Sequence, residues 1–169
     1  DFLPRLQVLE YTRAFLLGRM AWSQLDGLML ISGAMGMYDK ETVVKAGGYD
    51  VKTVGEDMEL VLRMRRYMTD NKQKYEVTYI PDPLCWTEAP SDLRTFSRQR
   101  SRWTRGLIQS LWKHRGMFLN PKYKTLGLMS FPYWLFFEWM APLLALAGFI
   151  YTGYLAFMGK VNWPFFFLL

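Results

Sequence analysis

Three stretches of the chain repeat apolar residues at the spacing of amphipathic helices. Residues 8–22 and 55–68 place apolar side chains three or four positions apart, with charged residues between them. Residues 92–112 continue the same pattern for longer, and Ser91 is a suitable N-cap for this helix. Its arginines make it basic as well as amphipathic, which is typical of a helix lying on a membrane surface. The alternative is a core helix with a solvated basic face.

Shorter signals complete an α/β pattern over the first 90 residues. Asp39 is a good N-cap for a short helix over residues 40–46, and Gly47-Gly48 should end it. Residues 28–31 form an apolar run between two glycines, and residues 76–80 are rich in β-forming side chains and are followed by prolines. Both runs favour buried strands. Helices that alternate with strands predict an α/β fold.

The last quarter of the chain is apolar throughout. Residues 126–169 hold two charged residues, Glu138 and Lys160, and residues 139–159 hold none. At ~1.5 Å per residue, residues 139–159 would extend about 31 Å, which matches a hydrocarbon core of ~30 Å. They therefore predict a transmembrane helix, and a second span would begin near residue 163. A core helix of a soluble protein is the alternative reading.

Almost all of the charged residues lie in the part of the chain before this span. The sequence has 21 Lys and Arg against 15 Asp and Glu, a net charge of +6, and 51% of its residues are hydrophobic. Such an excess suits nucleic acid, a membrane surface or anionic substrates. No nucleic-acid-binding motif occurs with matching spacing, so we expect no nucleic-acid partner. Basic residues precede the span and Lys160 alone follows it, which predicts a cytoplasmic location for the preceding part.

The single cysteine and the single histidine limit the kinds of site that the chain can contain. The one cysteine, Cys85, excludes an internal disulfide and a multi-cysteine metal site. The one histidine, His114, lies between Lys113 and Arg115, so we expect it to be solvated rather than bound to a metal. The chain ends inside the apolar run 165–169, which would have nothing left to pack against. We therefore expect a piece of a longer protein.

Three local groups could carry chemistry. In Gly55-Glu56-Asp57, the acids can simply stabilise a helix N-terminus, or one can accept the proton of a sugar hydroxyl as a general base. In the run 99–103, Gln-Arg-Ser-Arg-Trp, planar guanidinium groups could bind a diphosphate and the indole ring could support a sugar. The alternative is an ordinary surface segment. The loop 85–90, which contains Glu88, follows a predicted strand, where α/β enzymes build their sites. Its alternative is a plain loop with one packed tryptophan.

Together these motifs resemble the processive family 2 glycosyltransferases, which include cellulose, hyaluronan and poly-N-acetylglucosamine synthases. The resemblance is carried by Ser32-Gly33-Ala34, Glu56-Asp57 and Gln99-x-x-Arg102-Trp103, followed by a membrane span. It implies the C-terminal part of a GT-A fold, a UDP-sugar donor and inversion at the anomeric carbon. Many members have threonine where this chain has Gly55.

The resemblance also implies roles for individual residues. Asp57 would be the catalytic base, Arg102 would contact the donor diphosphate, and Trp103 would support the acceptor sugar. The remaining candidates would lie around the same cleft: Glu56, Gln99, Arg100, Ser32, Gly33, Ala34 and Glu88.

The resemblance divides the chain at residues 90 and 125. Residues 1–90 would be the C-terminal half of a GT-A catalytic domain, residues 91–125 a basic interfacial helix with a linker, and residues 126–169 the transmembrane region. A divalent metal, Mg or Mn, is expected in the full-length enzyme. No Asp-x-Asp motif occurs here, so we predict no metal ligand in this chain and no activity of the chain alone. The expected partners are a UDP-sugar donor, an oligosaccharide or polysaccharide acceptor and a lipid bilayer.

Two other functions fit the same residues. One is a non-processive transferase that adds a single sugar to a lipid-linked acceptor. The other is a non-catalytic membrane scaffold subunit, which would need neither Asp57 nor the Arg-Trp pair.

Overall fold

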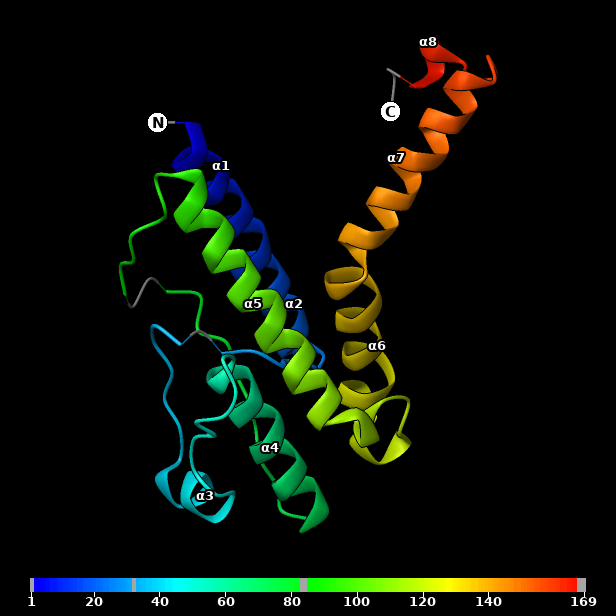
Figure 1. Ribbon diagram of the computed structural model, residues 1–169. Helices are drawn as coiled ribbons and strands as arrows, with labels where there is room; N and C mark the ends of the chain where they lie inside the picture. The colour runs from blue at the N-terminus through cyan, green and yellow to red at the C-terminus, as the bar shows by residue number, and fades with distance from the viewer. Residues whose placement is uncertain (1, 32, 83–84, 167–169) are drawn as a thin grey trace. The chain divides into compact units, whose positions relative to one another are not determined.

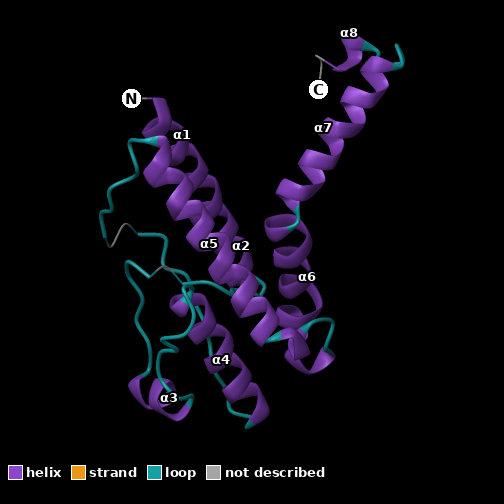
Figure 2. Ribbon diagram, in the orientation of Figure 1, coloured by secondary structure: helices purple, strands orange, loops and turns teal. Residues whose placement is uncertain are grey.

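The computed structural model describes residues 2–31, 33–82 and 85–166. Within these ranges every regular element is a helix and none is a strand (Figure 2). The chain forms two compact units, Asp1–Tyr133 and Trp134–Leu169. The helices of the predicted α/β pattern are therefore confirmed, whereas both predicted strands are wrong for the described residues.

Within the part of the chain that the structure describes, neither predicted strand region has a neighbouring strand. Both adopt irregular backbone, and a β-strand forms only where a second strand completes its ladder of hydrogen bonds. Side chains take some of these bonds instead. The carbonyl of Leu28 accepts from Arg65 at 2.8 Å, and the amide of Tyr79 donates to the hydroxyl of Ser23 at 2.9 Å.

The first helical stretch is longer than predicted and changes its pitch. It consists of α1 (Phe2–Tyr11), a π-helical segment (Thr12–Gly18) and α2 (Arg19–Gln24). The predicted helix over residues 8–22 is confirmed and extends in both directions. π-helical turns are rare and frequently occur at functional sites. This one ends directly before Arg19, a buried residue that interacts electrostatically with Asp57.

The long helix α5 (Leu93–Lys113) runs beside α1 and α2 (Figure 1). Its N-cap is Asp92, not the predicted Ser91, because the Asp92 carboxylate accepts from the amide of Thr95 at 2.9 Å. A hydrogen bond of 2.8 Å from the Gln7 side chain to the carbonyl of Pro90 fastens the start of α5 to α1.

Two shorter helices lie between α2 and α5 in the sequence, α3 (Lys40–Lys45) and α4 (Glu56–Asp70). Asp39 caps α3 as predicted, since its carboxylate accepts a backbone amide of the first turn at 2.7 Å. Gly47-Gly48 ends α3 with φ angles of 97° and 67°, which glycine adopts without strain. α4 begins where predicted, with Asp57 in its first turn.

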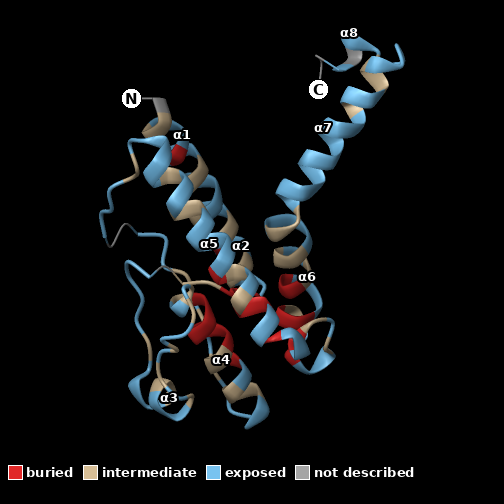
Figure 3. Cartoon of the chain, viewed as in Figure 1, coloured by how far each residue is buried: buried red, intermediate tan, exposed pale blue. Residues whose placement is uncertain are grey.

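The core of the first unit forms around α4. Leu60 and Leu62 have no exposed surface, and the charged Arg65 is only 2% exposed. Arg65 is compensated by the carboxylate of Asp26 at 2.6 Å and by the Leu28 carbonyl. Figure 3 shows the buried positions on α4 and at the C-terminal part of α5. The other buried apolar residues are Leu28, Met29, Met58, Val61, Leu111, Met117, Tyr123, Leu126 and Phe131.

Short helical segments complete the first unit after α5. Two 3₁₀ turns, Arg115–Met117 and Pro121–Tyr123, are followed by a π-helical segment (Leu126–Ser130) and by α6 (Phe131–Tyr133).

The second unit begins at Trp134. Its elements are a π-helical segment (Trp134–Trp139), α7 (Ala141–Phe157) and α8 (Trp163–Phe166). No single helix among the described residues is long and apolar enough to cross a membrane. Two successive segments, Leu126–Trp139 and Ala141–Phe157, reach that length and composition only together, with a 45° bend between them. The predicted span over residues 139–159 corresponds largely to α7, and its crossing of a membrane stays a prediction. Pro142, in the first turn of α7, cannot donate to a carbonyl in the preceding turn, which favours a break at this point.

Candidate active site

The turn around residue 33 lies against the carboxylate of Asp57. A Cβ atom placed on Gly33 would lie 3.0 Å from Oδ2 of Asp57 and 3.6 Å from its Cγ. Glycine therefore leaves free the space beside Oδ2 that a Cβ atom at residue 33 would fill. The structure thus brings together two predicted site residues from separate motifs. The neighbouring Ala34 is exposed, and Ser32 lies outside the described residues.

The two acids at the start of α4 have different surroundings. Asp57 is partly buried, and its Oδ1 accepts from the amide of Met58 at 2.8 Å while its Oδ2 faces the Gly33 turn. Glu56 is exposed. Successive side chains on an α-helix point about 100° apart, so the two acids do not face the same surface. Asp57 therefore fits the predicted base better than Glu56, and both roles stay predictions.

Two residues that the sequence did not single out also influence the surroundings of Asp57. Burial lowers the pKa of the Arg19 guanidinium, while Tyr79 and Asp57 act in the opposite direction. Burial raises the pKa of Tyr38 to about 12, and Tyr49 and Asp57 add to this rise. Neither Arg19 nor Tyr38 belongs to a recognisable motif. Only the folded chain reveals their closeness to the predicted base.

The loop before α4 rests on α5 through a contact between two glycines. A Cβ atom on Gly55 would lie 2.8 Å from Cα of Gly106, and the reverse substitution gives the same distance. The side-chain oxygen of Gln109 accepts from the amide of Val54 at 3.1 Å and from the hydroxyl of Thr53 at 3.2 Å. This contact lies within about one helical turn of Arg102 and Trp103 along α5.

The residues of the Gln-x-x-Arg-Trp box differ in their availability to a ligand. Arg100 donates to the carboxylate of Glu10 at 2.5 and 2.6 Å, and its guanidinium lies 4.6 Å from the centroid of the Trp103 ring. Arg100 thus fastens α5 to α1, and its predicted part in donor binding gains no support from these contacts. Gln99 is partly buried, whereas Arg102 is exposed and forms no ion pair with the described residues. Trp103 is 38% exposed, so Arg102 and Trp103 remain open to a ligand.

The loop over residues 85–90 is open to solvent. Trp86 is 95% exposed, so the alternative of a loop with one packed tryptophan is wrong. Glu88 and Cys85 are exposed as well. The predicted role of Glu88 in binding donor or acceptor stays a prediction.

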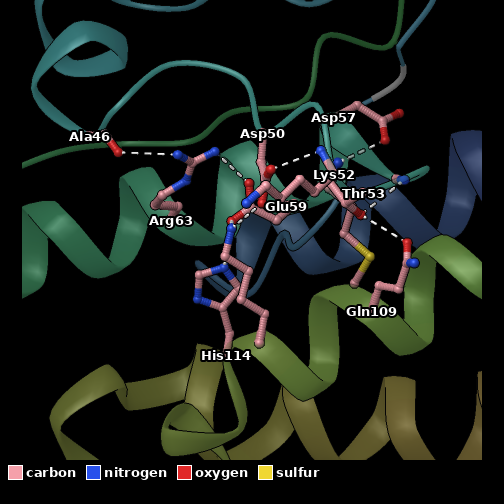
Figure 4. Close-up of polar contacts among 12 residues, drawn as sticks. Ala46, Asp50, Lys52, Thr53, Asp57, Glu59, Arg63, Gln109 and His114 are labelled. Atoms are coloured by element: carbon pink, nitrogen blue, oxygen red, sulfur yellow. Dashed lines mark hydrogen bonds and ion pairs between the residues drawn. The ribbon is translucent and has the colours of Figure 1, made fainter.

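A buried carboxylate connects α4 to the end of α5. Glu59 has no exposed surface, and its oxygens lie 2.5 Å from Arg63, 2.7 Å from Lys113 and 3.2 Å from Nε2 of His114 (Figure 4). Burial alone would raise the pKa of Glu59, but hydrogen bonds from His114 and the two cations outweigh it and lower the pKa to about 2. The predicted solvated position of His114 is wrong, because its ring is buried against Glu59.

No group of three or more His, Cys, Asp or Glu side chains in the described ranges could hold a metal ion. The basic and phenolic groups of Arg19 and Tyr38 near Asp57 do not provide the carboxylate oxygens that Mg²⁺ or Mn²⁺ prefers. The described residues therefore do not fit the divalent metal expected for the full-length enzyme.

Comparison with known proteins identifies the family. Residues 1–169 match Glycosyl transferase family group 2, so the chain belongs to this family of glycosyltransferases. The predicted resemblance to family 2 enzymes is thereby confirmed. The chain is 30% identical over 147 residues to poly-beta-1,6-N-acetyl-D-glucosamine synthase of Staphylococcus aureus (strain COL), covering 85% of this chain and 32% of that protein.

Two further relatives have similar levels of identity. The poly-beta-1,6-N-acetyl-D-glucosamine synthase of Staphylococcus epidermidis is 26% identical over 162 residues, covering 94% of this chain and 35% of its own length. The probable glycosyltransferase YdaM of Bacillus subtilis (strain 168) is 29% identical over 124 residues, covering 71% of this chain and 27% of its own length. The chain thus spans about a third of the curated relatives it matches. No solved structure gives a significant match.

Proposed function

We propose that this chain is the acceptor-side part of a membrane-bound, inverting glycosyltransferase. The full-length protein transfers a sugar from a UDP-sugar donor to a growing polysaccharide. The observation that carries this proposal is the position of Gly33, whose missing side chain leaves space beside Oδ2 of Asp57 at the start of α4. Membership of glycosyl transferase family group 2 supports a GT-A-type fold for the whole catalytic domain.

In the proposed reaction, Asp57 is the general base. The acceptor hydroxyl oxygen attacks the anomeric carbon of the donor, and its proton moves to the Asp57 carboxylate. The bond from the anomeric carbon to the diphosphate oxygen breaks, and UDP leaves with the bonding electrons. Attack from the face opposite the leaving group inverts the anomeric centre. A base in this role must lie within hydrogen-bond reach of the hydroxyl, and the space that Gly33 leaves beside Oδ2 would admit that group.

The exposed pair on α5 would bind the two substrates. The planar guanidinium of Arg102 suits the leaving diphosphate, because it can donate two parallel hydrogen bonds. The partly exposed ring of Trp103 offers an apolar face for the acceptor sugar. The contact between Gly55 and Gly106 supports this assignment, because it brings the start of α4 next to the same stretch of α5.

The relatives indicate which substrates to test first. Two of them are named for the synthesis of poly-beta-1,6-N-acetyl-D-glucosamine, which makes UDP-N-acetylglucosamine the first donor to examine. A divalent metal would neutralise charge on the donor diphosphate. We place its ligands outside the described residues of this chain.

We also propose that the apolar C-terminal part contacts a lipid bilayer. α7 consists of apolar and small residues with no charge on any side, and none of its residues is buried. The bent pair Leu126–Trp139 and Ala141–Phe157 has the combined length and composition for a broken span. Basic residues precede it and Lys160 follows, which supports a cytoplasmic location for the catalytic part.

The test is to express the full-length protein in membranes and measure UDP release across a panel of UDP-sugars. We expect release with one donor above all others, together with a polymeric product. Absence of release with every donor would contradict the proposal. Release with a product that carries only one added sugar would overturn its polymerising part.

A further inference from the structure

The acid that follows Asp57 by two positions on α4 has no place in the proposed reaction. Glu59 is fully buried and faces away from solvent, whereas the proposed base lies at the Gly33 turn. A buried carboxylate is unfavourable unless cations and hydrogen bonds compensate it. The chain supplies Arg63 from α4 itself, and Lys113 and His114 from the end of α5. Three donors on one buried acid form a junction rather than a surface ion pair.

The junction reaches both the loop before α4 and α4 itself. Lys113 Nζ lies 2.6 Å from the carboxylate of Asp50 and 2.7 Å from that of Glu59. One cation of α5 is thus held between two acids on the α4 side. Figure 4 shows Asp50, Arg63 and His114 gathered around Glu59, and Gln109 close to Thr53.

The same helix α5 carries Arg102 and Trp103. The fastening points on α5 extend from Gly106 through Gln109 to His114, and they follow the exposed pair directly in the sequence. A rigid helix transmits the position of one end to the next turns. Fixing the end of α5 to α4 therefore fixes the exposed pair relative to the start of α4.

We propose that Glu59 is a positioning residue: by binding Lys113 and His114 it holds Asp57 at the distance from Arg102 and Trp103 that the reaction requires. This inference rests on the proposed function of Asp57. Its physical reason is the narrow tolerance of group transfer, since reacting atoms must meet at about 3–3.5 Å and a misplacement of ~1 Å can cost ~100-fold in rate.

The test uses the full-length enzyme and four variants. Glu59→Gln keeps the shape of the side chain and removes its charge. Lys113→Met keeps the apolar stem of a half-exposed side chain, and the double variant removes both charges. Glu41→Gln is the matched control, because Glu41 and Lys45 form an exposed pair at 3.1 Å with the same i, i+4 spacing as Glu59 and Arg63. The readouts are kcat per folded enzyme and the inhibition constant of UDP.

We expect kcat to fall roughly 10- to 100-fold in Glu59→Gln and in Lys113→Met. The inhibition constant of UDP should stay within about twofold, because the diphosphate contact remains intact on α5. The double variant should lose no more than the stronger single variant, as is expected for two groups that act as one unit. Glu41→Gln should match the wild type.

Three outcomes would overturn the inference. The first is a wild-type kcat per folded enzyme in Lys113→Met. The second is a loss of kcat in the double variant that equals the product of the two single losses. The third is a UDP inhibition constant that rises in the single variants together with the loss of kcat. Asp57→Asn, measured alongside, separates the two proposals. If it abolishes turnover while Glu59→Gln and Lys113→Met turn over like the wild type, only the positioning role fails. If it turns over like the wild type, the proposed function itself fails.

Discussion

Replacing Gly106 by alanine should push apart the helices that carry the proposed base and the proposed diphosphate contact. The new Cβ would lie 2.8 Å from Cα of Gly55 and 2.9 Å from its nitrogen. Carbon atoms in contact lie about 3.5–4.0 Å apart, so the two segments must separate by roughly 1 Å. The obstructing atoms belong to the backbone, and they cannot turn aside as the end of a flexible side chain could.

We expect turnover of full-length Gly106→Ala to fall by about 10- to 100-fold, because a misplacement of ~1 Å can change a rate by that much. Stability should change less than activity. Overpacking costs typically ~1–3 kcal/mol, but alanine is favoured over glycine inside a helix by about 1 kcal/mol. The assay is UDP release per folded enzyme, with the melting temperature recorded on the same samples.

Gly116→Ala is the matched control, because a Cβ atom there would meet nothing within 4 Å. It should turn over like the wild type. Wild-type turnover in Gly106→Ala would refute the argument that this contact sets the spacing of the site. A loss of folded protein with unchanged turnover in the remainder would refute it equally, since the contact would then serve stability alone.

Three further predictions concern the donor site, stability and topology. Arg102→Lys should weaken catalysis and UDP inhibition together, whereas Trp103→Ala should impair elongation and spare UDP inhibition; an unchanged UDP inhibition constant in Arg102→Lys contradicts this division. Because the pKa of Glu59 is lowered from 4.5 to about 2, the carboxylate should contribute on the order of 3 kcal/mol of stability above about pH 4.5, and lose it as the pH falls to about 2. The difference in melting temperature between wild type and Glu59→Gln should therefore narrow as the pH falls over that range. A difference that stays constant would contradict this contribution of the Glu59 carboxylate to stability. A reporter near Lys122 should be cytoplasmic and one near Lys160 should lie across the membrane; finding both on one side excludes a single crossing.

The helices could be predicted because each carries its own local signals. Asp39 and Gly47-Gly48 mark the two ends of α3 through side-chain capping and left-handed backbone, which depend on few neighbours. The strands could not be judged in the same way. A strand needs hydrogen bonds from a partner, and the apolar run 28–31 says nothing about whether that partner is present.

The site was predictable where a motif names the residue, but its contacts were not. Gly33 and Asp57 were both candidates, yet only the fold shows that one lies against the other. Arg100 looked suitable for a diphosphate because its distant partner, Glu10, cannot be recognised from sequence. His114 looked solvated because its neighbours in sequence are cations, although its ring is buried against an acid.

The central claim is that Asp57 removes the proton of the acceptor hydroxyl. The most direct measurement compares the turnover of full-length Asp57→Asn with its affinity for UDP. We expect turnover to fall by about 10²–10⁴-fold, the usual contribution of a general base, while the dissociation constant of UDP stays close to that of the wild type. Turnover at the wild-type level in folded Asp57→Asn would contradict the claim.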